Sequence, residues 1–191
     1  MESLLVSTGV VALAEIGDKT QLLAFILAAR FKKPLPIILG ILVATVINHG
    51  LAGVLGAWIT STISRELLHW VLGVSFIGMA IWTMIPDKIE EEETQIAQRF
   101  GIFGATFITF FLAEMGDKTQ IATVAMAAHY SAPLMVVIGT TLGMLIADVP
   151  AVFAGEKLAT KIPMRLVHSI AAAVFALLGF ATLMGAGSDF G

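Results

Sequence analysis

Cysteine is absent from all 191 residues, and charged residues make up only 13% of the chain. The missing cysteine excludes disulfides, zinc–thiolate sites and thiol chemistry. Soluble domains carry about a quarter charged residues, so this chain does not have the composition of one. The net charge of −3 is too small to indicate a nucleic-acid partner. Hydrophobic residues are abundant instead: they make up 58% of the chain, which is typical of an integral membrane protein.

Long apolar stretches set the expected fold. A helix that crosses a lipid bilayer needs about 20 mainly apolar residues, and six stretches meet this requirement. We therefore predict an all-α integral membrane protein with six transmembrane helices. The predicted spans cover residues 3–29, 34–60, 66–85, 100–128, 133–158 and 163–185.

The N-terminus and the loops predict in which membrane the protein lies and how it is oriented there. The N-terminus lacks the basic region and cleavage site of a signal peptide, so we expect the first helix to be retained, and no transit peptide is apparent. These features favour the plasma (inner) membrane of a bacterial or archaeal cell. If the spans alternate, eight basic loop residues face one side and only Arg65 faces the other. The positive-inside rule then places the eight in the cytoplasm and both termini outside it. The eight are Arg30, Lys32, Lys33, Lys88, Arg99, Lys157, Lys161 and Arg165.

The sequence repeats itself at an offset of 99 residues. The segment from Ala14 to Gln21 aligns with the segment from Ala113 to Gln120, with seven of eight positions identical. We predict a first three-helix repeat over residues 1–86, an acidic cytoplasmic linker over 87–99 and a second three-helix repeat over 100–191. Because three spans is an odd number, the second repeat enters the membrane from the opposite side. Such inverted repeats are common in secondary transporters, which bind their cargo near mid-membrane between the repeats.

Each repeat carries ionisable residues at mid-membrane depth, where a charge costs at least about 2.5–3.5 kcal/mol. In the first repeat they are Glu15, Asp18 and Lys19, and in the second Glu114, Asp117 and Lys118. Within a continuous helix, residues three and four apart share a face. We therefore expect the glutamate and aspartate of each motif to share a helix face, on which the lysine can pair with the glutamate. The glycine between them admits a close helix or a local backbone distortion.

The charges of the two motifs, if they converge, suggest a cation site. Four carboxylates and two ammonium groups sum to −4 + 2 = −2, which one divalent cation or two protons would neutralise. Oxygen ligands suit hard cations such as Ca²⁺, Mg²⁺ and Mn²⁺. The lysines could hold the carboxylates in place or supply charge when the metal leaves. Neutral oxygens could come from the adjoining Thr20, Gln21, Thr119 and Gln120.

Three further polar residues lie at membrane depth outside the motifs: Asn48 and His49 in the second helix, and Asp148 in the fifth, where it aligns with His49. Asp148 is predicted at mid-span in the fifth helix, where it lines the ion path or forms a structural pair. Asn48, in the second helix, is either a ligand or an interhelical hydrogen-bond partner. We predict a protein that is not an enzyme and has no bound cofactor, and the sequence does not indicate an oligomeric state. Glycines at matching positions of the repeats should permit close helix packing: Gly40, Gly56, Gly139 and Gly155.

The doubled Glu-x-Gly-Asp-Lys-Thr pattern, at residues 15–20 and 114–119, resembles the Gdt-type family of small cation/proton antiporters. The resemblance covers essentially the whole chain. It implies transport of Mn²⁺, with Ca²⁺ as the other substrate, in exchange for protons. The short chain resembles the bacterial branch, in which export is the expected direction. The ligands implied by the resemblance are Glu15, Asp18, Glu114 and Asp117.

Two other functions compete with an antiporter. A divalent-cation channel could use the same carboxylates as an acidic selectivity ring. An intramembrane aspartyl protease would need Asp18 and Asp117 as a dyad that shares a proton. The protease is the weaker alternative, because such a dyad does not require each aspartate to have its own glutamate and lysine in a repeated motif.

Overall fold

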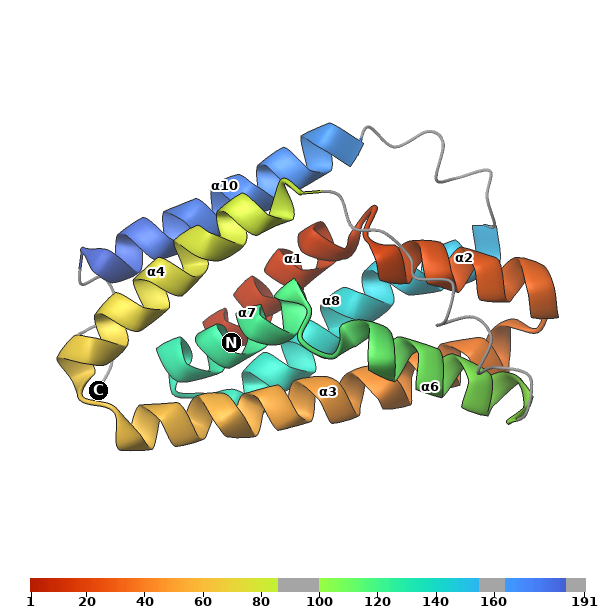
Figure 1. The fold of residues 1–191 in the computed structure, drawn as a ribbon, viewed down its shortest axis with the longest axis horizontal. Helices are drawn as coiled ribbons and strands as arrows, with labels where there is room; N and C mark the ends of the chain where they lie inside the picture. Colours follow the sequence, from red (N-terminus) through yellow and green to blue (C-terminus); the bar gives the residue numbers. More distant parts are fainter. Residues whose placement is uncertain (86–99, 155–163, 185–191) are drawn as a thin grey trace.

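The computed structural model describes residues 1–85, 100–154 and 164–184, and these residues form eight helices and no strand. The all-helical prediction is therefore confirmed over this part of the chain (Figure 1). The acidic linker and Gly155 lie outside the described residues. The helices are α1 (Glu2–Glu15), α2 (Lys19–Phe31), α3 (Pro34–Thr62), α4 (Arg65–Thr83), α6 (Gly101–Glu114), α7 (Lys118–Tyr130), α8 (Pro133–Ala154) and α10 (Met164–Leu183).

Two of the predicted membrane helices are broken in the middle. The first predicted span consists of α1 and α2, of 14 and 13 residues, and the fourth consists of α6 and α7, again of 14 and 13 residues. The prediction of one continuous helix through each motif was therefore wrong. Both breaks fall between the glutamate and the lysine of the motif, so the two halves are interrupted at corresponding positions.

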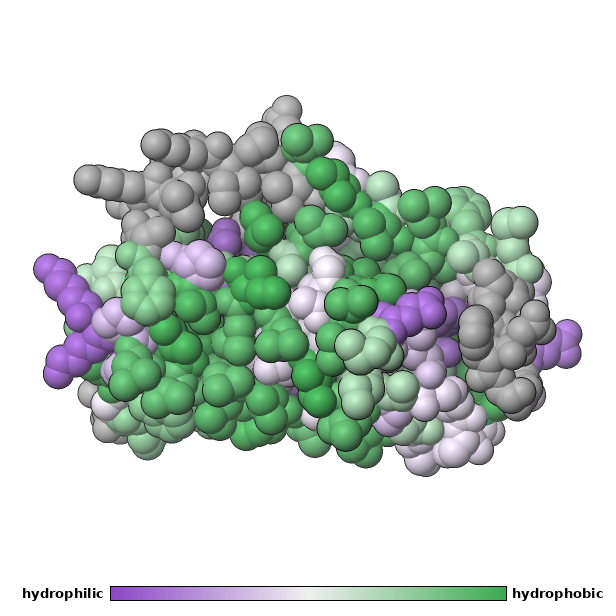
Figure 2. Space-filling view, turned by 180° about the vertical axis from the view of Figure 1, so that it is seen from behind, coloured by the Kyte–Doolittle hydropathy of each residue, from purple (hydrophilic) through white to green (hydrophobic). Residues whose placement is uncertain are grey.

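The helices of the described part fit a membrane environment. Three of them are long and apolar enough to cross a membrane: Pro34–Thr62, Glu66–Thr83 and Pro133–Phe153. Large hydrophobic side chains lie exposed along the outside of the molecule, and hydrophobic residues predominate on the face shown in Figure 2. These features are consistent with a membrane protein, while the count of six spans and their inverted arrangement stay predictions.

The two halves of the chain interlock. Helix α1 packs along α8 of the other half, and its counterpart α6 packs along α3. Close approach depends on glycine: a Cβ atom on Gly40 of α3 would lie 2.7 Å from the Thr106 Cβ of α6. A Cβ atom on Gly139 of α8 would clash with Ser7 of α1 in the same way. The close-packing prediction is confirmed at these two positions, and also at Gly56, where a Cβ would lie 2.5 Å from the Val124 carbonyl oxygen.

This interlocking brings the two breaks to the centre of the molecule. Helices α1 and α7 contact each other, α2 and α7 both contact α8, and α7 also packs on α3 (Figure 1). The long helices α3 and α8 therefore hold all four short helices in place. Helices α4 and α10 pack against each other and reach the rest of the bundle through α7 and α1 respectively.

Candidate metal centre

The first break is a tight turn that the sequence encodes directly. The Asp18 N–H donates to the Glu15 carbonyl at 3.0 Å, which closes a four-residue turn. Its central residues are Ile16, with φ −64° and ψ 114°, and Gly17, with φ 85°. These are the angles of a type II turn, which needs a positive φ at its third residue and so favours glycine there. The glycine of the motif is therefore a requirement of the backbone.

The second break repeats this turn. The Asp117 N–H donates to the Glu114 carbonyl at 3.1 Å, and Gly116 has a φ of 74°. In both halves the turn places the glutamate at the last residue of one helix and the aspartate just before the next. The four carboxylates therefore sit where two helices end and two begin.

The motif glutamines satisfy backbone groups that the breaks release, since helix ends leave N–H groups without helical partners. The Gly17 N–H donates to the Gln21 Oε1 at 2.9 Å, and the Gly116 N–H donates to the Gln120 Oε1 at 2.7 Å. These side-chain oxygens were predicted as candidate ligands, but here each one caps a turn. Gln21 also donates through its Nε2 to the Ala147 carbonyl of α8 at 3.0 Å, which anchors the first turn of α2.

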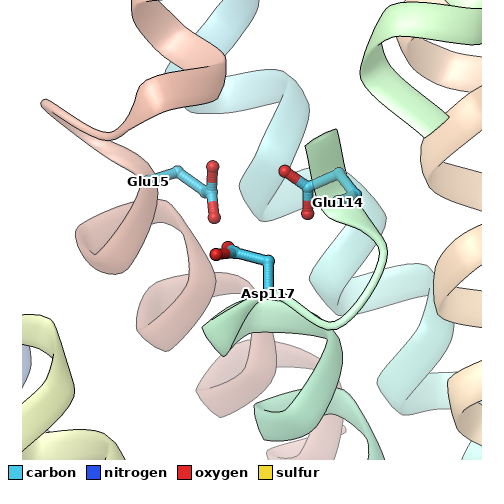
Figure 3. Close-up of side chains that lie close together, drawn as sticks. All are labelled: Glu15, Glu114 and Asp117. Atoms are coloured by element: carbon cyan, nitrogen blue, oxygen red, sulfur yellow. The ribbon is translucent and has the colours of Figure 1, made fainter. Parts of the chain in front are cut away.

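Carboxylates from both halves meet at the breaks. Glu15, Glu114 and Asp117 each offer an oxygen, and these oxygens lie within 4.8 Å of one another. Figure 3 shows the three side chains pointing toward a common point. The two glutamates are completely buried, and Asp117 is nearly so. We call these three residues the carboxylate cluster.

The motif threonines orient the glutamates of the cluster. The Thr20 hydroxyl donates to the Glu15 Oε2 at 2.6 Å, and the Thr119 hydroxyl donates to the Glu114 Oε2 at 3.0 Å. The second oxygen of each glutamate has no hydrogen-bond partner within the described part of the chain. Each glutamate is thus held by one oxygen, and the other could serve as a ligand of a cation. The threonines were predicted as possible ligands, and in this geometry they act as donors to the carboxylates.

Both motif lysines pair with an aspartate of the opposite half. Lys118 Nζ lies 2.8 Å from Asp18 Oδ1, and Lys19 Nζ lies 3.6 Å from Asp117 Oδ1. A turn separates each lysine from the glutamate four residues earlier, so the continuous-helix spacing on which their expected pairing rested does not apply. The ion pairs therefore cross between the repeats and tie the two motifs to each other.

The two halves of the site are not equivalent. Of the four predicted ligands, three form the carboxylate cluster, whereas Asp18 lies outside it and is buried against Lys118. Lys118 is 1% exposed, but Lys19 is 19% exposed and makes the longer ion pair. One repeat thus contributes two carboxylates to the cluster and the other contributes one.

Asn48, its neighbour His49 and Asp148, which lie outside the motifs, are all completely buried. The Asn48 Nδ2 donates to the Phe111 carbonyl at 3.1 Å, in the last turn of α6, so this residue links two helices near the second break. Asp148, on α8, follows the residue whose carbonyl accepts from Gln21. Neither carboxylate oxygen of Asp148 has a hydrogen-bond partner in the residues that the structure describes. Sequence reasoning missed the carbonyls of Phe111 and Ala147, because backbone groups carry no residue signature.

The cluster has the chemistry of a site for a hard cation. It offers carboxylate oxygens and, among the residues that the structure describes there, no sulfur or imidazole ligand. The first residues of α2 and α7 adjoin it, and helix N-termini carry a partial positive charge that stabilises nearby carboxylates. The two motif lysines add two positive charges to the four carboxylates.

Comparison with known proteins agrees with this chemistry. A family model described as "Divalent cation/proton antiporter GDT1" matches the chain twice, over residues 3–91 and 102–190. A Vibrio cholerae protein named "Putative manganese exporter" is 51% identical over 183 residues, which cover 95% of this chain and 90% of that protein.

Plant proteins are more distant relatives. "GDT1-like protein 3" of Oryza sativa subsp. indica is 32% identical, over 94% of this chain and 72% of its own length. "GDT1-like protein 5" of Arabidopsis thaliana is 29% identical, over 90% of this chain and 91% of its own length. No solved structure matches the chain.

Proposed function

Because the chain belongs to the GDT1 family of divalent cation/proton antiporters, we propose that it exports Mn²⁺ from the cytoplasm in exchange for protons, with Ca²⁺ as a second possible cargo. Membership makes it a transporter of divalent cations rather than an enzyme. The direction of transport, the proton coupling and the identity of the ligands belong to the proposal.

The carboxylate cluster is the observation that carries the proposal. Three buried carboxylates from the two repeats have oxygens within 4.8 Å of one another. Ionised carboxylates so close together repel, and burial adds to the cost, so they need a cation or protons between them. A divalent cation and protons therefore compete for the same oxygens. This competition is the physical basis of exchange: the site is seldom left both empty and charged.

The broken helices support the same function. Discontinuous helices at corresponding positions of two repeats are a common way for transporters to build a binding site near mid-membrane. Here both breaks lie at the acidic motifs, and the interlocked packing of α1 with α8 and of α6 with α3 places them together. An inverted repeat would then allow the same site to face either side of the membrane.

The choice of manganese and of export rests on the relatives and on charge. The relative with 51% identity carries manganese export in its name, and oxygen ligands suit Mn²⁺ as well as Ca²⁺. The eight-to-one distribution of basic loop residues favours cytoplasmic placement of the loops rich in lysine and arginine. Both termini then face outward.

The decisive test is flux in proteoliposomes. We expect an imposed proton gradient to drive Mn²⁺ across the membrane against its own gradient, with protons moving in the opposite direction. A channel would let Mn²⁺ run down its gradient but could not drive it uphill. Absence of proton-driven uphill movement of either Mn²⁺ or Ca²⁺ would refute exchange.

A further inference from the structure

We infer that Lys19 is a tethered cation that competes with the transported metal for Asp117, whereas Lys118 is a fixed partner of Asp18. The inference rests on the proposed function, because it assigns the two lysines different roles in the same site. The repeated sequence would suggest two equal ion pairs. The inference follows from the fact that their geometries differ.

Asp117 belongs to two arrangements at once. Its carboxylate is a member of the cluster with Glu15 and Glu114, and one of its oxygens lies 3.6 Å from Lys19 Nζ. A divalent cation bound to the cluster would lie close to the same carboxylate and would repel the lysine ammonium. The metal and the lysine are therefore alternatives at Asp117, in the way that the metal and protons are alternatives at the cluster.

Lys19 has a route by which to withdraw. Its side chain is 19% exposed, and its 3.6 Å separation from Asp117 is longer than a strong charge-assisted hydrogen bond. A lysine ammonium sits on a flexible four-carbon stem and is strongly hydrated. It can therefore leave the carboxylate for a wetter position without becoming a buried, unpaired charge.

Lys118 lacks that freedom. It lies 2.8 Å from Asp18, and both side chains are 1% exposed. Moving this ammonium away would leave two charges buried without their ion pair, which is strongly unfavourable. Asp18 also lies outside the carboxylate cluster, so a bound metal need not contact it. Lys118 is therefore suited to be a permanent structural counter-ion of Asp18.

This division of roles predicts that removing Lys19 raises the affinity for the metal. If Lys19 competes with the metal, replacing it with a neutral residue removes a rival cation, and metal binding becomes tighter. If Lys19 instead only positions Asp117, the same replacement loosens a ligand, and metal binding becomes weaker. The two roles therefore move the affinity in opposite directions.

The experiment is titration calorimetry of the purified full chain in detergent with Mn²⁺ at fixed pH and ionic strength. We expect Lys19→Gln to bind Mn²⁺ about tenfold more tightly than the unmodified protein, a change of about 1.4 kcal/mol. Lys19→Arg keeps the competing charge and should bind Mn²⁺ more weakly than Lys19→Gln. The matched control is Lys33→Gln, which removes the same charge from an exposed residue between α2 and α3.

Transport supplies a second readout. In proteoliposomes, Lys19→Gln should lower both the half-saturating Mn²⁺ concentration and the maximal exchange rate, because tighter binding slows release. Unchanged or weaker Mn²⁺ binding by Lys19→Gln would overturn the inference. If that variant does not fold, Lys19→Met, which keeps the apolar stem, provides the same comparison. Failure of the unmodified protein to bind Mn²⁺ would instead overturn the proposed function, and the inference with it.

Discussion

Lys118 and Asp18 form a completely buried ion pair, 2.8 Å between Nζ and Oδ1, that joins the first residue of α7 to the residue preceding α2. The pair connects the two repeats across the centre of the molecule. Removing one member of a buried ion pair leaves the other charge uncompensated, which is far more costly than removing both.

The stability of this pair can be measured by a double-mutant cycle. We expect Lys118→Met to lower the free energy of unfolding by about 3–5 kcal/mol, because it breaks a buried ion pair by removing one of its two charges. The double variant Lys118→Met with Asp18→Asn should regain most of that loss. Thermal and denaturant unfolding in detergent, followed by tryptophan fluorescence, provide the measurement. Equal losses in the single and double variants would show that the pair does not stabilise the fold.

Glu15 is the member of the carboxylate cluster that the first repeat contributes. We expect Glu15→Gln to reduce Mn²⁺ binding and exchange by about tenfold to a hundredfold or more, because an amide removes charge from the cluster while it keeps the shape. The protein should still insert and fold. Exchange in proteoliposomes and calorimetry measure the two effects.

The matched control for this variant lies on the same helix. Glu2→Gln removes the same charge from the exposed first turn of α1 and should leave exchange unchanged. Exchange at the unmodified rate in both Glu15→Gln and Asp117→Asn would end the assignment of the site.

Much of the site could be predicted from the sequence, and the reason is energetic. Six ionisable residues at mid-membrane depth are too costly to lie apart in hydrocarbon, and the repeat supplied two matching sets. These facts made convergence of the two motifs the condition on which the predicted cation site depended. The turn at Gly17 was foreseen only as an optional distortion, although a glycine two residues after Glu15 and just before Asp18 is the pattern of a type II turn.

The pairing of side chains could not be predicted in the same way. Helical spacing brings Glu15 and Lys19 together only if the helix continues, and the turn removes that relationship. Which lysine meets which aspartate depends on how α2 and α7 face each other, and the spacing within one motif says nothing about this. The role of Gln21 as a cap for the Gly17 N–H likewise exists only because the helix ends there.

The glycine of the second turn provides a test of the backbone geometry. Gly116 has a φ of 74°, and a Cβ atom placed on it would meet no atom within 4 Å. Gly116→Ala should therefore cost only the backbone strain of a left-handed residue, about 1–2 kcal/mol of unfolding free energy. Thermal unfolding in detergent gives the value.

A glycine inside a helix is the matched control for this change. A Cβ atom placed on Gly78 of α4 would also meet no atom within 4 Å, but this glycine lies in a regular helix. Gly78→Ala should stabilise the protein by up to about 1 kcal/mol, since alanine favours helix more than glycine does. If both substitutions shifted stability in the same direction, the turn would not have the described conformation.

Asp148 tests whether the ion path extends beyond the motifs. It is completely buried on α8, neither of its oxygens has a hydrogen-bond partner in the described residues, and its neighbour Ala147 accepts from the motif residue Gln21. A carboxylate placed this way contributes little to stability, because burying it without partners is unfavourable. It is therefore better suited to handling ions than to supporting the fold.

We expect Asp148→Asn to lower exchange by about tenfold or more while the unfolding temperature stays unchanged or rises, because the amide keeps the shape without the charge. Asp148→Glu retains a carboxylate and should recover part of the exchange. Flux in proteoliposomes and thermal unfolding on the same preparations separate the two effects. Full exchange in Asp148→Asn would exclude the residue from the ion path. A marked loss of stability would instead indicate that Asp148 forms a structural pair and supports the fold.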